Sequence, residues 1–291
     1  MKKRVLLTGI ILFLVVAAGI VMVRFRKPQH TSQTNNSDTY EYYYNNEDEE
    51  EEDSLLPENL DSILADNKTV PLDTIPSSTT VLVNRKYLLP STYIPKNLVV
   101  PNVDFSFSYV NDKRKMRKIA ATALEKLFAA GEKKGIKLYG VSGYRSYTRQ
   151  KEIYDRNVAT RGKAATDAVS AMPGSSEHQT GLTIDVSAQS VSYRLDQSFG
   201  DTKEGKWLAK HCHEYGFIIR YPYDKEKITG YSYEPWHIRY VGTTVAAYLY
   251  KNNLTLEEYY GVTLKDMEDS SKPETSVDVE DPDSVVYATP K

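Results

Sequence analysis

Cysteine is nearly absent from this chain of 291 residues, which contains only Cys212. A single cysteine can form neither an intramolecular disulfide nor a thiolate zinc cluster, so a disulfide-framed scaffold and a cysteine-based zinc centre are excluded. The sequence also lacks a glycine-rich phosphate loop, which removes the common nucleotide-binding motifs from consideration. Histidine is scarce as well, with five in the chain, so each can be weighed individually.

The charge is unevenly distributed, although the net charge is only −2. Residues 1–27 carry six basic and no acidic side chains, and residues 28–70 carry twelve acids and one lysine. Residues 266–291 carry eight acids and two lysines, which leaves +9 on residues 71–265. A basic domain between acidic flanks favours polyanionic surroundings, and both nucleic acid and an anionic cell envelope fit that description.

Residues 1–27 have the pattern of a membrane anchor. An uncharged run of 19 residues, 5–23, is flanked by basic residues on both sides, and about 20 apolar residues cross a bilayer as a helix. We expect an uncleaved, single-pass signal anchor, with a cleaved signal peptide or a buried helix as alternatives. No cysteine lies directly after the run, so a lipoprotein anchor is excluded. The rest of the chain is then expected outside the cytoplasm.

Two acidic segments flank the expected domain. Residues 28–70 are polar and contain an unbroken run of seven acids at 47–53. Such a run repels itself and stays extended, so the segment is predicted to be a disordered linker. Residues 266–291 are rich in acids, serine and proline and are predicted to be a second disordered tail. One folded domain is therefore expected at 71–265.

Within that domain, short helices and strands are predicted in mixed order. Apolar residues at helical spacing predict a long helix over residues 112–134 and further helices over 146–161 and 204–215. Strands are expected at 136–142, 181–186, 217–221 and 236–241. Because helices and strands do not alternate regularly, the fold class is expected to be α+β.

Two histidines and one aspartate lie at the edges of expected strands. His178 is in a turn-rich loop that leads into the strand carrying Asp185, and His237 opens a later strand. A catalytic zinc site uses three protein ligands and keeps a fourth position for water. Glu234 precedes His237 by three residues and offers a carboxylate that could take a proton from that water. Taken singly, each histidine is more often structural, but a carboxylate in an apolar strand costs free energy unless it is paired or metal-bound.

Three motifs together resemble a known family. Residues 142–150 read SGYRSYTRQ, residues 176–185 read SEHQTGLTID and residues 234–237 read EPWH. In this order and spacing they closely resemble the VanY-type D-alanyl-D-alanine carboxypeptidases, which are zinc peptidases acting on peptidoglycan stem peptides. The resemblance covers roughly residues 80–250. It implies a small antiparallel sheet flanked by helices, with the zinc site at strand edges, as in DD-peptidase and hedgehog-like folds.

The resemblance also implies roles for individual residues. Zn²⁺ would be bound by His178, Asp185 and His237, and Glu234 would act as the general base. Arg145 would be a catalytic and substrate-binding residue that holds the substrate carboxylate or stabilises developing negative charge. Two further positions that line the substrate pocket in relatives are matched by Gln150 and Ser176.

Several alternatives stay open at this point. An endopeptidase acting on the cell wall and a non-catalytic wall-binding protein are the competing functions, although a binding protein has no use for a free base beside a metal. The motifs do not separate D,D- from L,D-specificity. We expect a monomer that binds peptidoglycan stem peptides and no nucleic acid. The sequence His211-Cys212-His213 looks like a metal site, but residues two apart do not share a helix face, so a structural role is expected.

Overall fold

The computed structural model describes residues 70–167, 170–263 and 274–275. The predicted anchor at 1–27 lies outside the described residues, as do nearly all of the predicted linker and tail, so these expectations stay predictions. Within the part of the chain that is described, no helix has the length and apolar character needed to span a bilayer.

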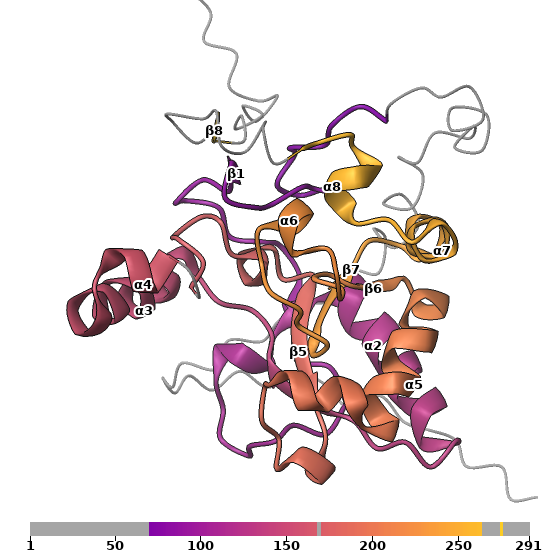
Figure 1. Cartoon of the computed structure of the whole chain (residues 1–291). Helices are drawn as coiled ribbons and strands as arrows, with labels where there is room; N and C mark the ends of the chain where they lie inside the picture. The colour runs from indigo at the N-terminus through magenta and orange to yellow at the C-terminus, as the bar shows by residue number, and fades with distance from the viewer. Residues whose placement is uncertain (1–69, 168–169, 264–273, 276–291) are drawn as a thin grey trace, which may run out of the picture. The chain divides into compact units, whose positions relative to one another are not determined.

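The domain is built around a four-stranded antiparallel sheet with the strand order β4-β5-β7-β6. Three of these strands, β5, β6 and β7, are labelled in Figure 1. Every residue of β5 is buried, as expected for an inner strand that is covered on both faces. Two short pairs, β1 with β8 and β2 with β3, lie outside this sheet. The strands are β1 (Tyr87–Leu88), β2 (Leu98–Val99), β3 (Met116–Arg117), β4 (Tyr139–Ser142), β5 (Thr183–Ser187), β6 (Phe217–Ile219), β7 (His237–Tyr240) and β8 (Glu274–Thr275).

Helices surround the sheet, and the pair α3 and α4 projects to one side of it (Figure 1). The helices are α2 (Lys118–Glu132), α3 (Tyr147–Arg161), α4 (Lys163–Asp167), α5 (Lys203–His211), α6 (Glu226–Thr229), α7 (Thr243–Asn252) and α8 (Leu256–Tyr259). Short 3-10 turns occur at η2 (Asp112–Arg114), η3 (Glu177–Thr180), η4 (Gln189–Val191), η5 (Gln197–Asp201) and η6 (Cys212–Tyr215). The expected α+β class is confirmed, with helices and a small antiparallel sheet.

Two apolar clusters hold the sheet between its helices. The larger one joins β5 and β7 to α2 and α5 through fully buried side chains, among them Ile184, Ile238, Leu124 and Leu208. The second packs β6 against α7 and α8 through Ile218, Val245 and Leu256. Each fully buried side chain of this size contributes roughly 1.5–3 kcal/mol relative to an exposed one. The sheet is therefore a rigid platform for side chains at the ends of its strands.

The long helix predicted at 112–134 begins later than expected. Residues 112–114 form the turn η2, and the chain is extended at Arg117, where β3 pairs with β2. The Arg117 N–H donates to the Gly181 carbonyl at 2.8 Å, and α2 then runs from 118 to 132. These tertiary hydrogen bonds outweigh the helical propensity of the basic stretch. The basic residues there do not share one helix face, and Arg117 is buried.

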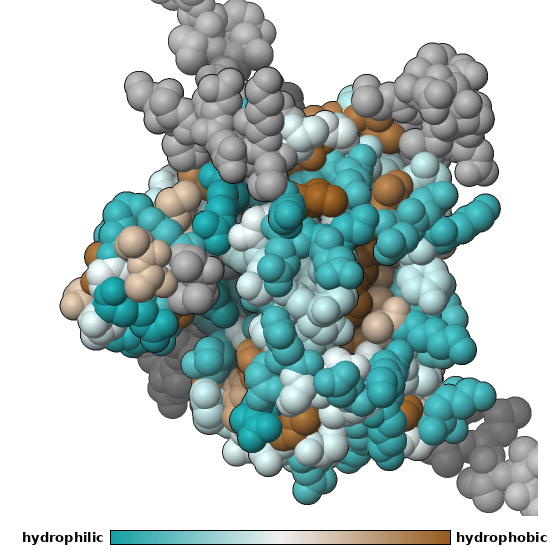
Figure 2. Space-filling model, viewed as in Figure 1, coloured by the Kyte–Doolittle hydropathy of each residue, from teal (hydrophilic) through white to brown (hydrophobic). Residues whose placement is uncertain are grey.

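The surface seen in Figure 2 is largely hydrophilic, with hydrophobic residues in small separate groups. Large exposed apolar side chains occur at scattered positions, such as Val110, Tyr223 and Ile94. Isolated exposed apolar residues are ordinary for a soluble domain surface.

Candidate active site

Three buried side chains from separate elements meet on one face of the sheet. His178 lies in η3, Asp185 lies in β5 and His237 opens β7. The register of β5 and β7 places Asp185 directly opposite His237, so their side chains extend from the same face. One ligand atom from each of the three lies within 4.8 Å of the others. The structure thus brings together all three of the metal ligands proposed from sequence.

The spacing of these atoms fits a zinc ion. His178 Nε2 lies 3.4 Å from Asp185 Oδ2, and His237 Nδ1 lies 3.1 Å from Asp185 Oδ1. Tetrahedral zinc with bonds of about 2.0–2.2 Å separates neighbouring ligand atoms by about 3.4 Å. Two imidazoles and one carboxylate are also a donor set that zinc accepts with a fourth position free. The residues present therefore fit this metal in both chemistry and distance.

The His178 ring is fixed by a backbone carbonyl. Its Nδ1 donates to the Gly143 carbonyl at 2.8 Å, which leaves Nε2 directed at Asp185. A Cβ on Gly143 would lie 2.5 Å from the Lys115 carbonyl, so the close approach of this loop requires glycine. Burial lowers the pKa of His178 to about 3. The ring is therefore neutral at physiological pH and has a lone pair available for a metal.

Glu234 stands beside this cluster without being part of it. Its Oε2 lies 3.7 Å from His237 Nδ1, and its side chain keeps 28% of its surface exposed. Burial raises the pKa of Glu234 to about 7. A carboxylate with this pKa can both accept and release a proton near neutral pH, which is what a general base must do.

His237 has a different electrostatic environment from His178. Burial disfavours its charged form, but its contacts with Asp185 and Glu177 outweigh this and raise the pKa of His237 to about 9. In the metal-free site His237 is therefore protonated at pH 7. The ring of Tyr221 packs against it at a centroid distance of 4.9 Å, and Tyr231 stacks on Tyr221 in turn.

Arg145 follows β4 and is near enough to Asp185 and Glu234 to interact with both electrostatically. Its Nη1 donates to Gln150 Oε1 at 2.9 Å, its Nη2 donates to Ser142 Oγ at 3.3 Å, and burial lowers the pKa of Arg145. The Gln150 amide is itself fixed by donation to the Ala171 carbonyl at 2.6 Å. Gln150 is 2% exposed, and it is the one buried residue of α3. Its contacts hold Arg145 in place, so its geometry is that of a supporting residue behind the guanidinium.

Ser176 lies at the start of η3, two residues before His178. It is buried, and its hydroxyl does not cap the turn. The neighbouring Ser175 hydroxyl donates to the Met172 carbonyl at 2.9 Å. Ser176 is therefore close in sequence to His178, and it takes part in the turn through its carbonyl, which accepts the Gln179 N–H at 3.1 Å, and not through its hydroxyl.

The histidines around Cys212 serve packing, as expected. His211 contacts Glu214, and the ring of His213 stacks on Tyr250 at 3.7 Å. Cys212 is buried, and burial raises its pKa to about 12. Over the described residues, the cluster of His178, Asp185 and His237 is the one group of three or more such side chains with metal-binding geometry.

A buried charge cluster beneath the site was missed by the sequence analysis. It consists of Glu177, Arg220, Arg239 and Glu257, all of which have side chains with no exposed surface. The sequence contained one signal of this cluster, namely arginine beside or within apolar strands. Arg220 follows the apolar strand β6, and Arg239 lies between Ile238 and Tyr240 in β7. Arginine inside such runs indicates a buried counter-ion.

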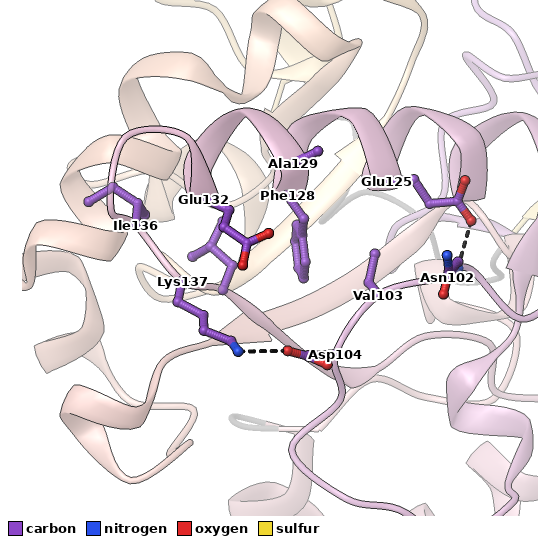
Figure 3. A pocket seen from close by; sticks show the side chains of 10 residues that line it. Asn102, Val103, Asp104, Glu125, Phe128, Ala129, Glu132, Ile136 and Lys137 are labelled. Atoms are coloured by element: carbon purple, nitrogen blue, oxygen red, sulfur yellow. Dashed lines mark hydrogen bonds and ion pairs between the residues drawn. The ribbon is translucent and has the colours of Figure 1, made fainter. Parts of the chain in front are cut away.

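A hollow of about 250 Å³ lies elsewhere, between α2 and residues 102–104 (Figure 3). Lys137 pairs with Asp104 at 3.0 Å there, and the Glu125 carboxylate accepts the Asn102 N–H at 2.6 Å. None of the metal-cluster side chains lines it. The metal cluster and this hollow are therefore separate features.

Comparison with known proteins identifies relatives over the same region. The family model "VanY: D-alanyl-D-alanine carboxypeptidase" matches residues 113–243. "Putative carboxypeptidase YodJ" of Bacillus subtilis is 50% identical over 65% of this chain and 70% of its own length. The bifunctional D-Ala-D-Ala dipeptidase and carboxypeptidase VanXYC of Enterococcus gallinarum is 36% identical over 63% of this chain and 94% of its own.

Solved structures agree with these matches. The LdcB LD-carboxypeptidase has a TM-score of 0.63 and 47% identity, and the match covers 67% of this chain and 94% of that one. A variant of the vancomycin-resistance D,D-pentapeptidase VanY, solved with Zn(II), has a TM-score of 0.50 and 35% identity, with 62% of this chain and 98% of that one covered.

Proposed function

This chain belongs to the VanY family of D-alanyl-D-alanine carboxypeptidases and is a zinc carboxypeptidase of peptidoglycan, and from that premise we propose that it removes the terminal D-alanine of stem peptides outside the cell membrane. The observation that carries the proposal is the buried cluster of His178, Asp185 and His237 with Glu234 beside it. Three protein ligands with a free carboxylate alongside form a hydrolytic arrangement.

Each residue has a defined task in the proposed reaction. His178, Asp185 and His237 bind Zn²⁺, which when bound lowers the pKa of water to about 7 and polarises the scissile carbonyl. Glu234, with a pKa near 7, accepts the proton of the attacking water and delivers it to the leaving D-alanine amine.

Arg145 supplies the positive charge of the site. Its guanidinium either binds the terminal carboxylate of the peptide in a bidentate manner or stabilises the oxyanion that develops at the scissile carbonyl. Gln150 and Ser142 fix its orientation through their hydrogen bonds. We propose Ser176 as a residue of the pocket wall, on the basis of its place before η3.

The L,D-reaction is favoured by the identity of 47% to the LdcB LD-carboxypeptidase, against 35% to the D,D-pentapeptidase VanY. The substrate is then the tetrapeptide stem, whose terminal D-alanine follows a diamino acid. The D,D-reaction on the pentapeptide stem is the second candidate. It is supported by the 36% identity to the bifunctional VanXYC enzyme.

The proposed location follows from the substrate. Peptidoglycan lies outside the cytoplasmic membrane, and the uncharged run at 5–23 has the length of a membrane-spanning helix. We therefore propose that residues 1–27 anchor the enzyme and that residues 28–70 act as a spacer between the membrane and the domain.

The test uses the full chain with tetrapeptide and pentapeptide stems in separate reactions, followed by mass spectrometry. We expect the loss of one alanine from the tetrapeptide, its inhibition by a zinc chelator and its recovery on adding zinc. Loss from the pentapeptide alone would establish the D,D-reaction instead. Cleavage of neither peptide by the zinc-loaded chain would overturn the carboxypeptidase assignment.

A matched pair of variants tests the metal ligands. His237→Ala is expected to lose both zinc and activity, whereas His211→Ala is expected to keep both, because His211 contacts Glu214 away from the cluster. Equal zinc content in the two variants would remove His237 from the ligand set.

A further inference from the structure

A network of four buried charges lies directly behind the metal cluster. The Glu177 carboxylate oxygen Oε1 accepts from Arg220 Nε at 2.8 Å and from Arg239 Nη1 at 2.6 Å. On its other side, Arg220 donates to both oxygens of Glu257 at 2.8 and 2.7 Å. Two carboxylates thus balance two guanidiniums, which is the condition under which buried charges are tolerated.

The second oxygen of Glu177 faces the metal cluster. Glu177 Oε2 accepts from Thr183 Oγ1 at 3.3 Å and lies 3.5 Å from His237 Nε2. That nitrogen is buried and forms no hydrogen bond with any of the described residues. The other ring nitrogen, Nδ1, faces Asp185. His237 therefore presents one nitrogen to the cluster and the other to a carboxylate held by two arginines.

The two histidines of the cluster have similar surroundings: one ring nitrogen faces Asp185, and the other faces an oxygen atom behind the ring. His178 directs Nε2 at Asp185 and donates Nδ1–H to the Gly143 carbonyl. His237 directs Nδ1 at Asp185 and has Glu177 Oε2 at the corresponding position behind the ring. Metal-ligating histidines generally donate their other N–H to a carboxylate or carbonyl, which fixes the tautomer and the ring orientation.

We propose that Glu177 is a positioning residue for His237: its Oε2 accepts the Nε2–H of the ligand histidine, which fixes the ring so that Nδ1 is the nitrogen aimed at the metal. The two arginines hold the carboxylate through Oε1 and thereby fix the direction of Oε2. The proposal rests on the proposed metal site, because it assigns a function to the far side of one of its ligands.

Glu177→Gln tests this contact selectively. The variant keeps the size of the side chain, and its amide oxygen can still accept from Arg220 and Arg239. The amide NH₂ then faces His237 Nε2–H, so a donor meets a donor. Glu257→Gln is the matched control, because it alters the same network through Arg220 and its contacts are with Arg220 and Asn84.

The measurement is the zinc dissociation constant of the full chain, obtained by competition with a chromophoric chelator. Glu177→Gln is expected to raise it about 10- to 100-fold, and Glu257→Gln is expected to leave it within about threefold of the unaltered chain. The visible absorption bands of the cobalt-substituted protein should shift in Glu177→Gln and stay in place in Glu257→Gln. If Glu177 only stabilised the fold, both variants would change the dissociation constant and the absorption bands to a similar extent.

Two further variants make every outcome decisive. If Glu177→Gln does not fold, Glu177→Asp replaces it, because it keeps the charge and withdraws the carboxylate from His237; a rise in the dissociation constant above that of Glu257→Gln is again expected. His237→Ala separates the two proposals. If it loses zinc while the Glu177 variants bind zinc as tightly as Glu257→Gln, the positioning role is overturned and the metal site stands. If His237→Ala binds zinc normally, the metal site itself is wrong.

Discussion

Replacing Glu257 with glutamine should destabilise the fold strongly, although this residue is far from the catalytic motifs in the sequence. Glu257 lies in α8, and its side chain has no exposed surface. It accepts two hydrogen bonds from Arg220, at 2.8 and 2.7 Å, and one from Asn84 at 3.3 Å. Glu257→Gln removes the negative charge and leaves Arg220 with Glu177, which it shares with Arg239, as its counter-ion.

The expected loss can be estimated from this geometry. Breaking a buried ion pair by removing one partner costs about 3–5 kcal/mol. For a domain of 150–250 residues, each kcal/mol lowers Tm by about 2–4 °C, so a fall of about 6–20 °C is expected.

The assay is thermal unfolding of the zinc-loaded protein, followed by circular dichroism and supported by urea denaturation. Arg149→Gln is the control, because its ion pair with Glu152 at 2.8 Å is exposed on both sides and such pairs contribute about 0–1 kcal/mol. If Glu257→Gln lowered Tm no more than Arg149→Gln, the argument that the network stabilises the domain would be refuted.

Four other outcomes are expected. Glu234→Gln should lower kcat about 10²- to 10⁴-fold with zinc content unchanged, because it removes a base and no metal ligand; steady-state kinetics and metal analysis check this. Gln150→Ala should lower kcat/KM about tenfold or more, since Arg145 loses a charged hydrogen bond. Zinc binding at pH 7 should release at least about one proton, because in the metal-free site the pKa of His237 is about 9 and that of Glu234 is about 7. The apparent zinc affinity then rises with pH up to about 9, and calorimetry in buffers of different ionisation enthalpy measures the protons released. Cys212 should resist alkylation at pH 8 until the protein unfolds, since its thiol is buried with a pKa of about 12.

Each of these expectations has a contrary result. Full activity in the Glu234 variant would assign the base elsewhere, and an unchanged kcat/KM in the Gln150 variant would show that Arg145 does not depend on it. Zinc binding without proton release would mean that His237 is neutral before the metal arrives. Rapid labelling of native Cys212 would show that its surroundings open readily.

The sequence could indicate that His178, Asp185 and His237 lie together, because they belong to short motifs. His178 and Asp185 are seven residues apart, in a turn followed by a strand, and β7 brings His237 opposite Asp185. The helix start at 118 was not predictable in the same way, since Arg117 is drawn into an extended conformation by Gly181, which is distant in sequence. Local propensity does not contain such contacts.

The buried charges were missed for a related physical reason. Arginine and glutamate are ordinarily exposed, and recognising an exception requires knowing the partner. Glu177 and Arg220 are 43 positions apart, and Arg220 and Glu257 are 37 positions apart. Gln150 illustrates the same limit, because the motif marked it as a pocket residue, which stays a prediction, and gave no sign of its hydrogen bonds to Arg145 and the Ala171 carbonyl.

The network also explains why the domain extends beyond its catalytic motifs. The family model covers residues 113–243, but Arg239 Nη2 donates to the carbonyls of Thr79 and Val81 at 3.0 and 2.9 Å, and Arg220 is bound by Glu257. Both arginines hold Glu177, which faces His237. Segments on either side of the motif region therefore complete the electrostatic support behind the metal cluster. A chain cut to 113–243 would keep all three ligands and Glu177 but lose Glu257 and the carbonyls that bind Arg239, so we expect it to be much less stable than the full chain.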